Sequence, residues 1–170
     1  MATGLVPADC WFLTFARMHG NPVARALGWL WELPAYVLDV TLRRMLAARR
    51  ARRRARLRGL PMLNVGAGGE SFTTTLYGDV NVDLHPSPGV VVADVQDLPF
   101  PDGAFGAVFA SHIFEHVEDP DRARFECERV SSPDDVFVVT PSWWAPHTWF
   151  YEPHLWYFSD GHGGGERIRL

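Results

Sequence analysis

The stretch "NVGAGGESFTTTLYGDVNVDL", residues 64–84, joins two short apolar runs through a turn rich in small residues. Gly66 and Gly68 allow the backbone to approach a ligand at a point where a Cβ atom would clash. Asp83 ends the second run, where a carboxylate can accept both hydroxyl groups of a ribose. This layout is typical of a nucleotide-binding turn, but a glycine turn alone does not identify the ligand.

Beyond Gly59 the sequence alternates short apolar runs with turn residues. This texture predicts five strands and one helix. The strands are expected in "PMLNVGAGG", "DVNVDL", "GVVVADV", "AFGAVFASHIF" and "DVFVVTP", and the helix in "DRARFECERV". Short buried strands with intervening helices indicate an α/β fold with a mostly parallel, doubly wound sheet.

Charge divides the chain into two parts. Residues 1–58 hold eleven arginines against three carboxylates, for a net charge of +8, whereas the other residues hold five arginines against seventeen carboxylates, for −12. An acidic body lacks the basic face that phosphate contacts need, so nucleic acid is not favoured as a partner. We expect residues 1–58 to form an apolar and arginine-rich helical segment.

A helix is predicted from Pro34 to about Gly59, because Leu38, Leu42, Met45 and Leu46 recur at helical spacing. An RNA-binding arm is disfavoured, because no aromatic residues are interleaved with the arginine run, and two interpretations stay open. The apolar stripe packs on the domain and the arginines are solvated, or the helix lies on an anionic membrane surface. The apolar stretch before it is interrupted by polar residues and proline, which argues against a membrane-spanning helix.

The first residues do not have the pattern of a signal peptide, and the two cysteines, Cys10 and Cys127, lack metal-type spacing. We therefore expect free thiols and a cytoplasmic location, with possible peripheral attachment to a membrane.

After the third predicted strand, the sequence reads Asp94 and then "VQDLPFPDGAFGAVFASHIFEHVEDP". Together with the glycine turn and Asp83, this stretch resembles the class I S-adenosylmethionine-dependent methyltransferases, closest to the small-molecule group that includes quinone-biosynthesis enzymes. The resemblance covers about residues 62–141 and implies a Rossmann-like fold, with S-adenosylmethionine as cofactor.

The resemblance also implies roles for individual residues. Gly66, Ala67 and Gly68 would flank the methionine part of the cofactor, with Asn64 just before them. Asp83 would hold the ribose, Asp94 the adenine amino group, and Val95 would contact the adenine ring through its backbone. Ser111 and His112 would face the sulfonium and the acceptor. His112 and His116 are the candidate catalytic residues, and His147 and His154 form too weak a pattern to predict a metal site.

The sequence departs from the family at four positions. Asn64 replaces an acidic residue and Glu70 replaces a glycine of the loop; Gly106 stands where the family has aspartate, and Pro133, Asp134 and Asp135 replace a P-G-G turn. Loss of the charge at residue 64 weakens a charge-assisted hydrogen bond by roughly a kcal/mol. The connection between Gly68 and Asp83 also leaves room for little more than a short helix or a loop.

Eight aromatic residues lie between Trp143 and Phe158. They either line an acceptor pocket or substitute for core that the last two strands of the family's sheet would supply. Those strands are expected to be missing here, unless a partner completes the sheet. We expect a methyltransferase-like domain over residues 59–158 and a flexible tail over 159–170.

The predicted function is methyl transfer to a small apolar or lipid-linked acceptor. The alternative is a non-catalytic relative that serves as a membrane-peripheral or partner-binding module. The sequence leaves both possibilities open.

Overall fold

A computed structural model describes residue 34 and residues 37–68, 77–142, 155–159 and 167–169. Several predictions concern residues outside these ranges. They include the short connection after Gly68, most of the aromatic stretch, His147, His154 and Cys10.

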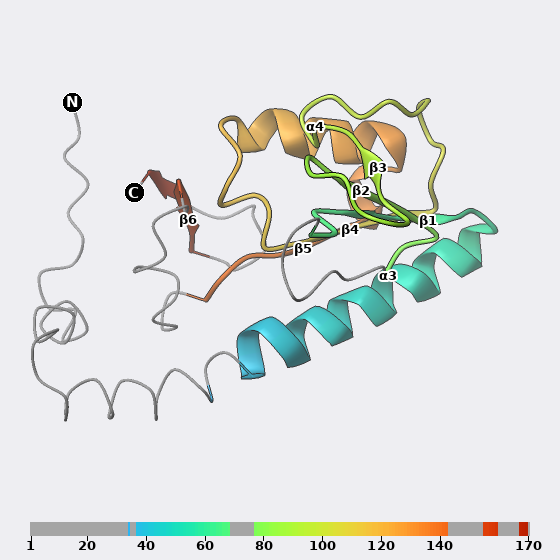
Figure 1. Ribbon diagram of the computed structural model, residues 1–170. Coiled ribbons are helices and arrows are strands. Elements are labelled where there is room, and N and C mark those ends of the chain that lie inside the picture. Colours follow the sequence, from blue (N-terminus) through green and yellow to red (C-terminus); the bar gives the residue numbers. More distant parts are fainter. Residues whose placement is uncertain (1–33, 35–36, 69–76, 143–154, 160–166, 170) are drawn as a thin grey trace, which may run out of the picture.

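The core of the fold is a parallel sheet of five strands in the order β3-β2-β1-β4-β5 (Figure 1). The strands are β1 (Met62–Val65), β2 (Val80–Asp83), β3 (Val91–Val92), β4 (Ala107–Ser111) and β5 (Val136–Val139). All four neighbouring pairs are parallel, as the sequence predicted. The order reverses beside β1, so the carboxyl ends of β1 and β4 flank the position where such sheets bind ligands.

Two helices cover opposite faces of the sheet (Figure 1). Helix α3 (Arg44–Arg58) follows a π-helical turn, η1 (Val37–Arg43), and ends at Gly59, which has a left-handed φ of 66°. Helix α4 (Pro120–Val130) begins at Asp119, whose side chain accepts a hydrogen bond from the Arg122 N–H. A short 3₁₀ helix, η2 (Pro133–Asp135), leads into β5. Among the described residues, no helix combines the length and hydropathy needed to cross a membrane.

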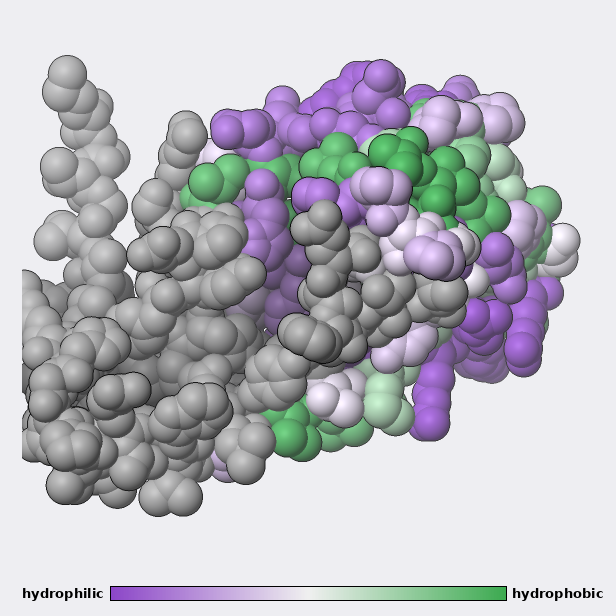
Figure 2. Space-filling model, viewed as in Figure 1, coloured by the Kyte–Doolittle hydropathy of each residue, from purple (hydrophilic) through white to green (hydrophobic). Residues whose placement is uncertain are grey.

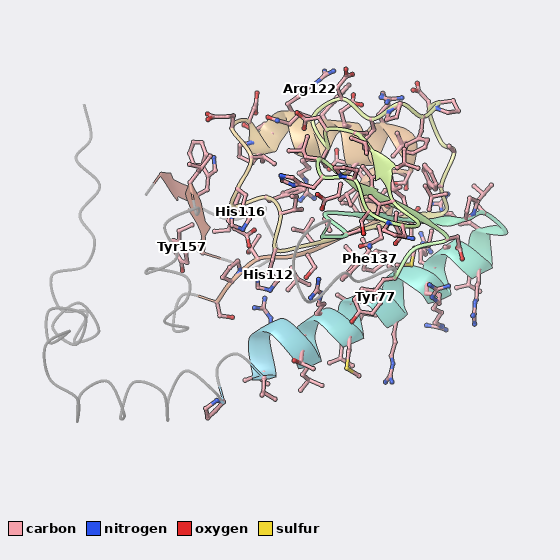
Figure 3. The ribbon with its side chains drawn as sticks, in the orientation of Figure 1. Tyr77, His112, His116, Arg122, Phe137 and Tyr157 are labelled. Carbon is pink, nitrogen blue, oxygen red and sulfur yellow. The ribbon has the colours of Figure 1, made fainter. Side chains whose placement is uncertain are left out.

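The central strands β1 and β4 bury both of their faces, because successive side chains point to opposite sides of a sheet, whereas the two residues of the edge strand β3 are exposed. On the α4 side, Leu63, Val65 and Val108 belong to a large core that also contains Phe114. On the α3 side, Met62 and Phe109 pack against the helix, and Figure 3 shows Tyr77 and Phe137 in the same layer. The near-continuous apolar strands of the sequence reflect this double coverage.

Helix α3 packs through alanines and not through its leucines. Ala48, Ala51 and Ala55 are buried, whereas Leu42 and Leu46 are 45% and 43% exposed. The interpretation that the leucine stripe packs on the domain is therefore wrong. Small side chains let the helix axis lie close to the strands, because no larger group holds the two elements apart.

The absence of a side chain at Gly106 allows α3 to approach the sheet this closely. A Cβ atom added to Gly106 would lie 2.8 Å from the Ala55 Cα and 2.9 Å from the Ala55 carbonyl oxygen. The aspartate that the family places here would clash with the helix backbone, so this departure is matched to the position of α3.

Asp135, another departure from the family, anchors the same helix. Its side chain is 1% exposed and accepts hydrogen bonds from Arg54 and from the Ser132 hydroxyl, and it forms an ion pair with Arg58. Burial acts to raise the pKa of Asp135, but Ser132 and the two arginines outweigh it and hold the pKa below its ordinary value. The carboxylate therefore stays charged and ties the end of α3 to the turn before β5.

A short antiparallel hairpin closes the chain, formed by β6 (Trp156–Phe158) and β7 (Arg167–Arg169). Phe158 is 2% exposed and belongs to the core on the α4 side. This end of the aromatic stretch therefore supplies core, as one of the two interpretations proposed. Residues 167–169 form a strand, although they fall within the segment expected to be a flexible tail.

Candidate active site

The glycine turn follows β1 and folds over the end of β2. The Val82 carbonyl accepts hydrogen bonds from the N–H groups of Gly66 and Ala67, at 2.9 and 3.1 Å. Gly66 and Gly68 have φ values of 72° and 77°, a left-handed conformation that glycine adopts without strain. A Cβ atom on Gly66 would also lie 3.0 Å from the Cβ of Ile113, so the turn packs tightly against the loop after β4. Both positions therefore favour glycine for their backbone conformation, and close approach of a ligand to this turn stays a prediction.

Asp83 lies at the end of β2 and holds the glycine turn in place. Its Oδ2 accepts a hydrogen bond from the Gly68 N–H at 2.8 Å, and its Oδ1 accepts one from the His85 N–H at 3.0 Å. Each carboxylate oxygen can accept a second hydrogen bond, so both remain able to bind a hydroxyl group. Asp83 is thus fixed in orientation by the backbone that it stabilises.

Asp94 follows β3 and is oriented by Gln96. Its Oδ1 accepts a hydrogen bond from the Gln96 N–H at 2.8 Å, and both of its oxygens lie within 3.2 Å of the Gln96 side-chain nitrogen. The Gln96 side-chain oxygen in turn accepts a hydrogen bond from the Asp119 N–H. Between them, Val95 is buried in the core, which fixes its backbone. Gln96 was not predicted as a site residue, and it links the loops after β3 and β4.

Asn64 turns toward the neighbouring strand. Its Nδ2 donates to the side-chain oxygen of Asn81 at 3.0 Å, in a fully buried pair. Asn81 also bonds both backbone groups of Gly78. The amide pair joins β1 to β2 just below the glycine turn, so Asn64 supports the turn from beneath.

Two buried hydroxyl groups lie at the carboxyl ends of the central strands. Ser111 ends β4 and Thr140 follows β5, and their side-chain oxygens have no hydrogen-bond partner in the part of the chain that the structure describes. Arg43, at the start of α3, reaches the same edge and donates to the Thr140 carbonyl at 3.2 Å and to the Ser142 hydroxyl at 2.6 Å. A buried polar group without a partner is costly, which makes this edge a candidate for ligand contact.

His112 has an unusual backbone for a non-glycine residue, with a φ of 55°. Its N–H donates to the Val139 carbonyl at 2.8 Å, which ties the loop after β4 to β5. Residues in this conformation are strained, and such strain is concentrated at functional sites. Figure 3 shows His112 and His116 at the carboxyl edge of the sheet, as the sequence predicted.

Glu115 lies between the two histidines and is fully buried. Its Oε1 is 3.4 Å from His112 Nδ1 and 3.9 Å from His116 Nε2. Burial acts to raise the pKa of Glu115, but the two histidines lower it further than burial raises it, so the pKa lies below its ordinary value. A carboxylate facing Nδ1 of His112 favours the tautomer in which Nε2 is the basic nitrogen.

Sequence reasoning missed Glu115 and Arg43. Glu115 stands three residues after His112 in the stretch that follows Asp94, and a carboxylate so near a candidate catalytic histidine could have indicated a pair. Arg43 gave no such signal, because its contacts lie 97 and 99 residues away along the chain.

A family model described as a methyltransferase domain matches residues 26–139, which is more than half of the chain. The chain belongs to this methyltransferase family. Its cofactor is S-adenosylmethionine, and the Rossmann-like fold of class I methyltransferases agrees with the parallel sheet.

Individual relatives are more distant. An uncharacterized methyltransferase from Mycolicibacterium gilvum is 28% identical over 128 residues, which cover 65% of this chain and 50% of the relative. The YcgJ protein from Bacillus subtilis has a solved structure with 20% identity and a TM-score of 0.42, over 58% of this chain and 50% of that one. A possible histamine N-methyltransferase from Thermotoga maritima has 22% identity and a TM-score of 0.38, over 64% and 60%. The chain spans about half the length of the curated relative.

The methyltransferase cofactor fits the residues present. The glycine turn folds over the end of β2, and each oxygen of Asp83 accepts one backbone N–H and can accept a ribose hydroxyl as well. Asp94 stands fixed at the end of β3, and the Ser111 hydroxyl is buried without a partner among the described residues. These groups emerge at one edge of the sheet, which is the arrangement that a bound nucleoside requires.

Proposed function

We propose that this methyltransferase transfers a methyl group to a small apolar or lipid-linked acceptor held at the carboxyl ends of β4 and β5. The observation that carries the proposal is the strained His112, whose ring faces a buried carboxylate beside the glycine turn. Backbone strain is costly and is concentrated at functional sites, so a strained histidine that faces a buried carboxylate supports a functional role for this edge.

Bound S-adenosylmethionine would supply an electrophilic methyl group. Asp83 would hold the ribose and Asp94 the adenine, and Ser111 and His112 lie at the same edge of the sheet, where the acceptor would bind. His112 Nε2 would accept a proton from an acceptor that must lose one, and Glu115 would stabilise the resulting positive charge through Nδ1. Because methyl transfer is an in-line displacement, close and aligned binding supplies much of the rate.

An apolar acceptor is supported by the composition of the described edge. Ile113 packs against the glycine turn, and Trp156 packs against the core beside the same loop. The hydroxyl groups of Ser111 and Thr140 lie at the same edge, so the acceptor would present a largely apolar surface with one or two polar atoms. A lipid-linked molecule has this character, and so does a small aromatic compound.

Calorimetry with S-adenosylhomocysteine, the demethylated product, tests the first part of the proposal. We expect wild-type protein to bind it and Asp83→Ala to lose binding. Asp97→Ala is the matched control, because Asp97 is an exposed carboxylate in the neighbouring loop and should leave the affinity unchanged. Absence of binding by a folded wild-type protein would refute the proposal.

The chemical step needs a separate measurement. His112→Gln should lower the rate of S-adenosylhomocysteine formation with a hydrophobic acceptor at least tenfold, because general base catalysis contributes about 10²–10⁴-fold where a proton must be removed. Its affinity for S-adenosylhomocysteine should stay within twofold of wild type. Equal rates for both proteins would exclude His112 as the base.

A further inference from the structure

The side of α3 that faces away from the sheet carries large apolar side chains in the open. Leu38, Leu42 and Leu46 are 44%, 45% and 43% exposed, and Leu57 is 70% exposed. Within α3, the outward face consists of Leu46, Arg49, Arg53, Arg56 and Leu57, which recur at helical spacing, and Leu38 and Leu42 precede it. Figure 3 shows a row of side chains leaving α3 on this side.

Seven of the eight arginines of α3 fall into two groups, and the eighth, Arg44, lies over the ring of Tyr77. Arg52, Arg54 and Arg58 turn inward, where Arg52 bonds the Tyr77 carbonyl and the other two bind Asp135. Arg49, Arg50, Arg53 and Arg56 are exposed, and in the described part of the chain none of these four has an acidic partner.

The exposed arginines repel one another. Helix α3 contains no acidic residue, and its arginines stand three and four residues apart. Like charges at this spacing destabilise a helix. In Figure 2, hydrophilic residues dominate the lower right of the molecule, where the second half of α3 lies, and a hydrophobic patch lies on the lower edge near its start. An anionic surface that also accepts apolar side chains would reduce the repulsion between the arginines and cover the exposed leucines.

We propose that the outward face of α3 binds an anionic lipid surface, with the leucines inserted among the lipid chains and Arg49, Arg53 and Arg56 on the headgroups. The leucines decide against nucleic acid, which offers charge but no apolar surface to cover them. The arginine side chains can extend their aliphatic stems along the apolar layer and keep their charges at headgroup depth. Residues 59–170 have a net charge of −12, so the same lipid would repel them. The outward face of α3 would then be the point of attachment.

Attachment through α3 would hold the candidate site near the lipid surface. This step rests on the proposed function. Helix α3 runs antiparallel to the strands, so its start lies at the carboxyl edge of the sheet, where Arg43 bonds Thr140 and Ser142 (Figure 1). The leucine-rich end of the helix is therefore the end nearest the candidate site. A lipid-linked acceptor would reach the site from the surface to which the helix binds.

Sedimentation with vesicles of phosphatidylcholine, with and without phosphatidylserine, tests the inference without any need for catalysis. We expect binding only to the anionic vesicles, and weaker binding as salt is raised. Each arginine near such a surface contributes a factor of about five in affinity, so the triple variant R49Q/R53Q/R56Q should bind about a hundredfold more weakly. Leu42→Ser with Leu46→Ser should also weaken binding. All five positions are solvent-accessible in the helix, so the variants should stay folded.

The matched control compares R53Q with R122Q. Both remove one accessible arginine, but Arg122 lies on α4, on the opposite face of the sheet (Figure 3). R53Q should weaken vesicle binding about fivefold, and R122Q should leave it near wild type. Equal binding to neutral and anionic vesicles, or equal losses in R53Q and R122Q, would overturn the inference. Full binding by the leucine variant would also overturn it, because the contact would then be electrostatic only, without insertion of the leucines.

Discussion

The ion pairs of Asp135 with Arg54 and Arg58 predict that removal of both arginines costs more stability than removal of the aspartate. Removing the carboxylate in Asp135→Ala leaves two arginines that are 42% and 41% exposed and can turn into water. The cost is then the lost pair alone, about 1–2 kcal/mol. Removing both arginines leaves a carboxylate that is 1% exposed, with the Ser132 hydroxyl as its donor. An unpaired buried charge costs about 3–5 kcal/mol.

The difference of about 2 kcal/mol corresponds to a melting temperature lower by about 4–8 °C in the arginine double variant than in Asp135→Ala, for a chain of this size. Adding Asp135→Ala to the double variant should restore stability to nearly that of the single aspartate variant, because the buried charge is then gone. Thermal unfolding followed by circular dichroism measures all four proteins.

The dependence on pH gives a second readout with a defined sign. In wild type the pKa of Asp135 lies below the unfolded value of 3.8, so its contribution is present above that pH and is lost as the pH falls through the lower folded value. In the arginine double variant burial acts with less opposition and raises the pKa, so protonation relieves the penalty as the pH falls. The difference in unfolding free energy between wild type and the arginine double variant should therefore narrow from pH 7 to pH 4. A gap that stays constant, or an aspartate variant less stable than the arginine variant, would refute this explanation.

Three further predictions concern packing and ionisation. Gly106→Ala should cost about 1–3 kcal/mol, because its Cβ would meet the backbone of Ala55, and Ala55→Gly should not rescue it, since the clash does not involve the Ala55 side chain. Glu126→Gln should cost about 1–2 kcal/mol at pH 7, because it weakens a 2.8 Å pair with Arg129. That loss should shrink below pH 4.5, since the Arg129 hydrogen bond holds the pKa of Glu126 under this value; urea unfolding at both pH values tests it. Burial raises the pKa of Cys127 to about 12, so its thiol should resist iodoacetamide in native protein at pH 8 and react after unfolding, as mass spectrometry would detect.

The sequence predicted the sheet because its local signals agree with the fold. β1, β2, β4 and β5 are short apolar runs between turn residues, and α4 begins with a proline after a capping aspartate. β3 is shorter than the run "GVVVADV" suggested, with only Val91 and Val92 in the strand. Asp94 and Gln96 explain this, since their side-chain and backbone hydrogen bonds turn the chain away soon after β3.

The helix before β1 shows where reasoning from hydrophobic periodicity fails. Periodicity favours burial of the largest apolar residues, so it selected the leucines of the stripe. The actual contact uses alanines, because Gly106 leaves room for the helix backbone itself. This room exists only between segments about fifty residues apart, and no local pattern in either one reveals it. Prediction of the site has the same limitation. The sequence indicated the glycine turn and Asp83, but it did not indicate Arg43, whose contacts lie far away along the chain.

The departures from the family pattern make most sense as one set. Gly106 removes a side chain that would hold α3 away, Asp135 adds a carboxylate in a turn where the family has glycine, and Arg54 and Arg58 supply its counter-charges. Each change alone is unfavourable or of little use, because a buried carboxylate without arginines is costly and the arginines without it lose their charged partner at that turn. Together they fix α3 at short range against β4 and β5, with its alanines inward. This orientation leaves the leucines and the remaining arginines facing outward, so the substitutions that hold the helix to the domain also determine the face that it presents to its surroundings.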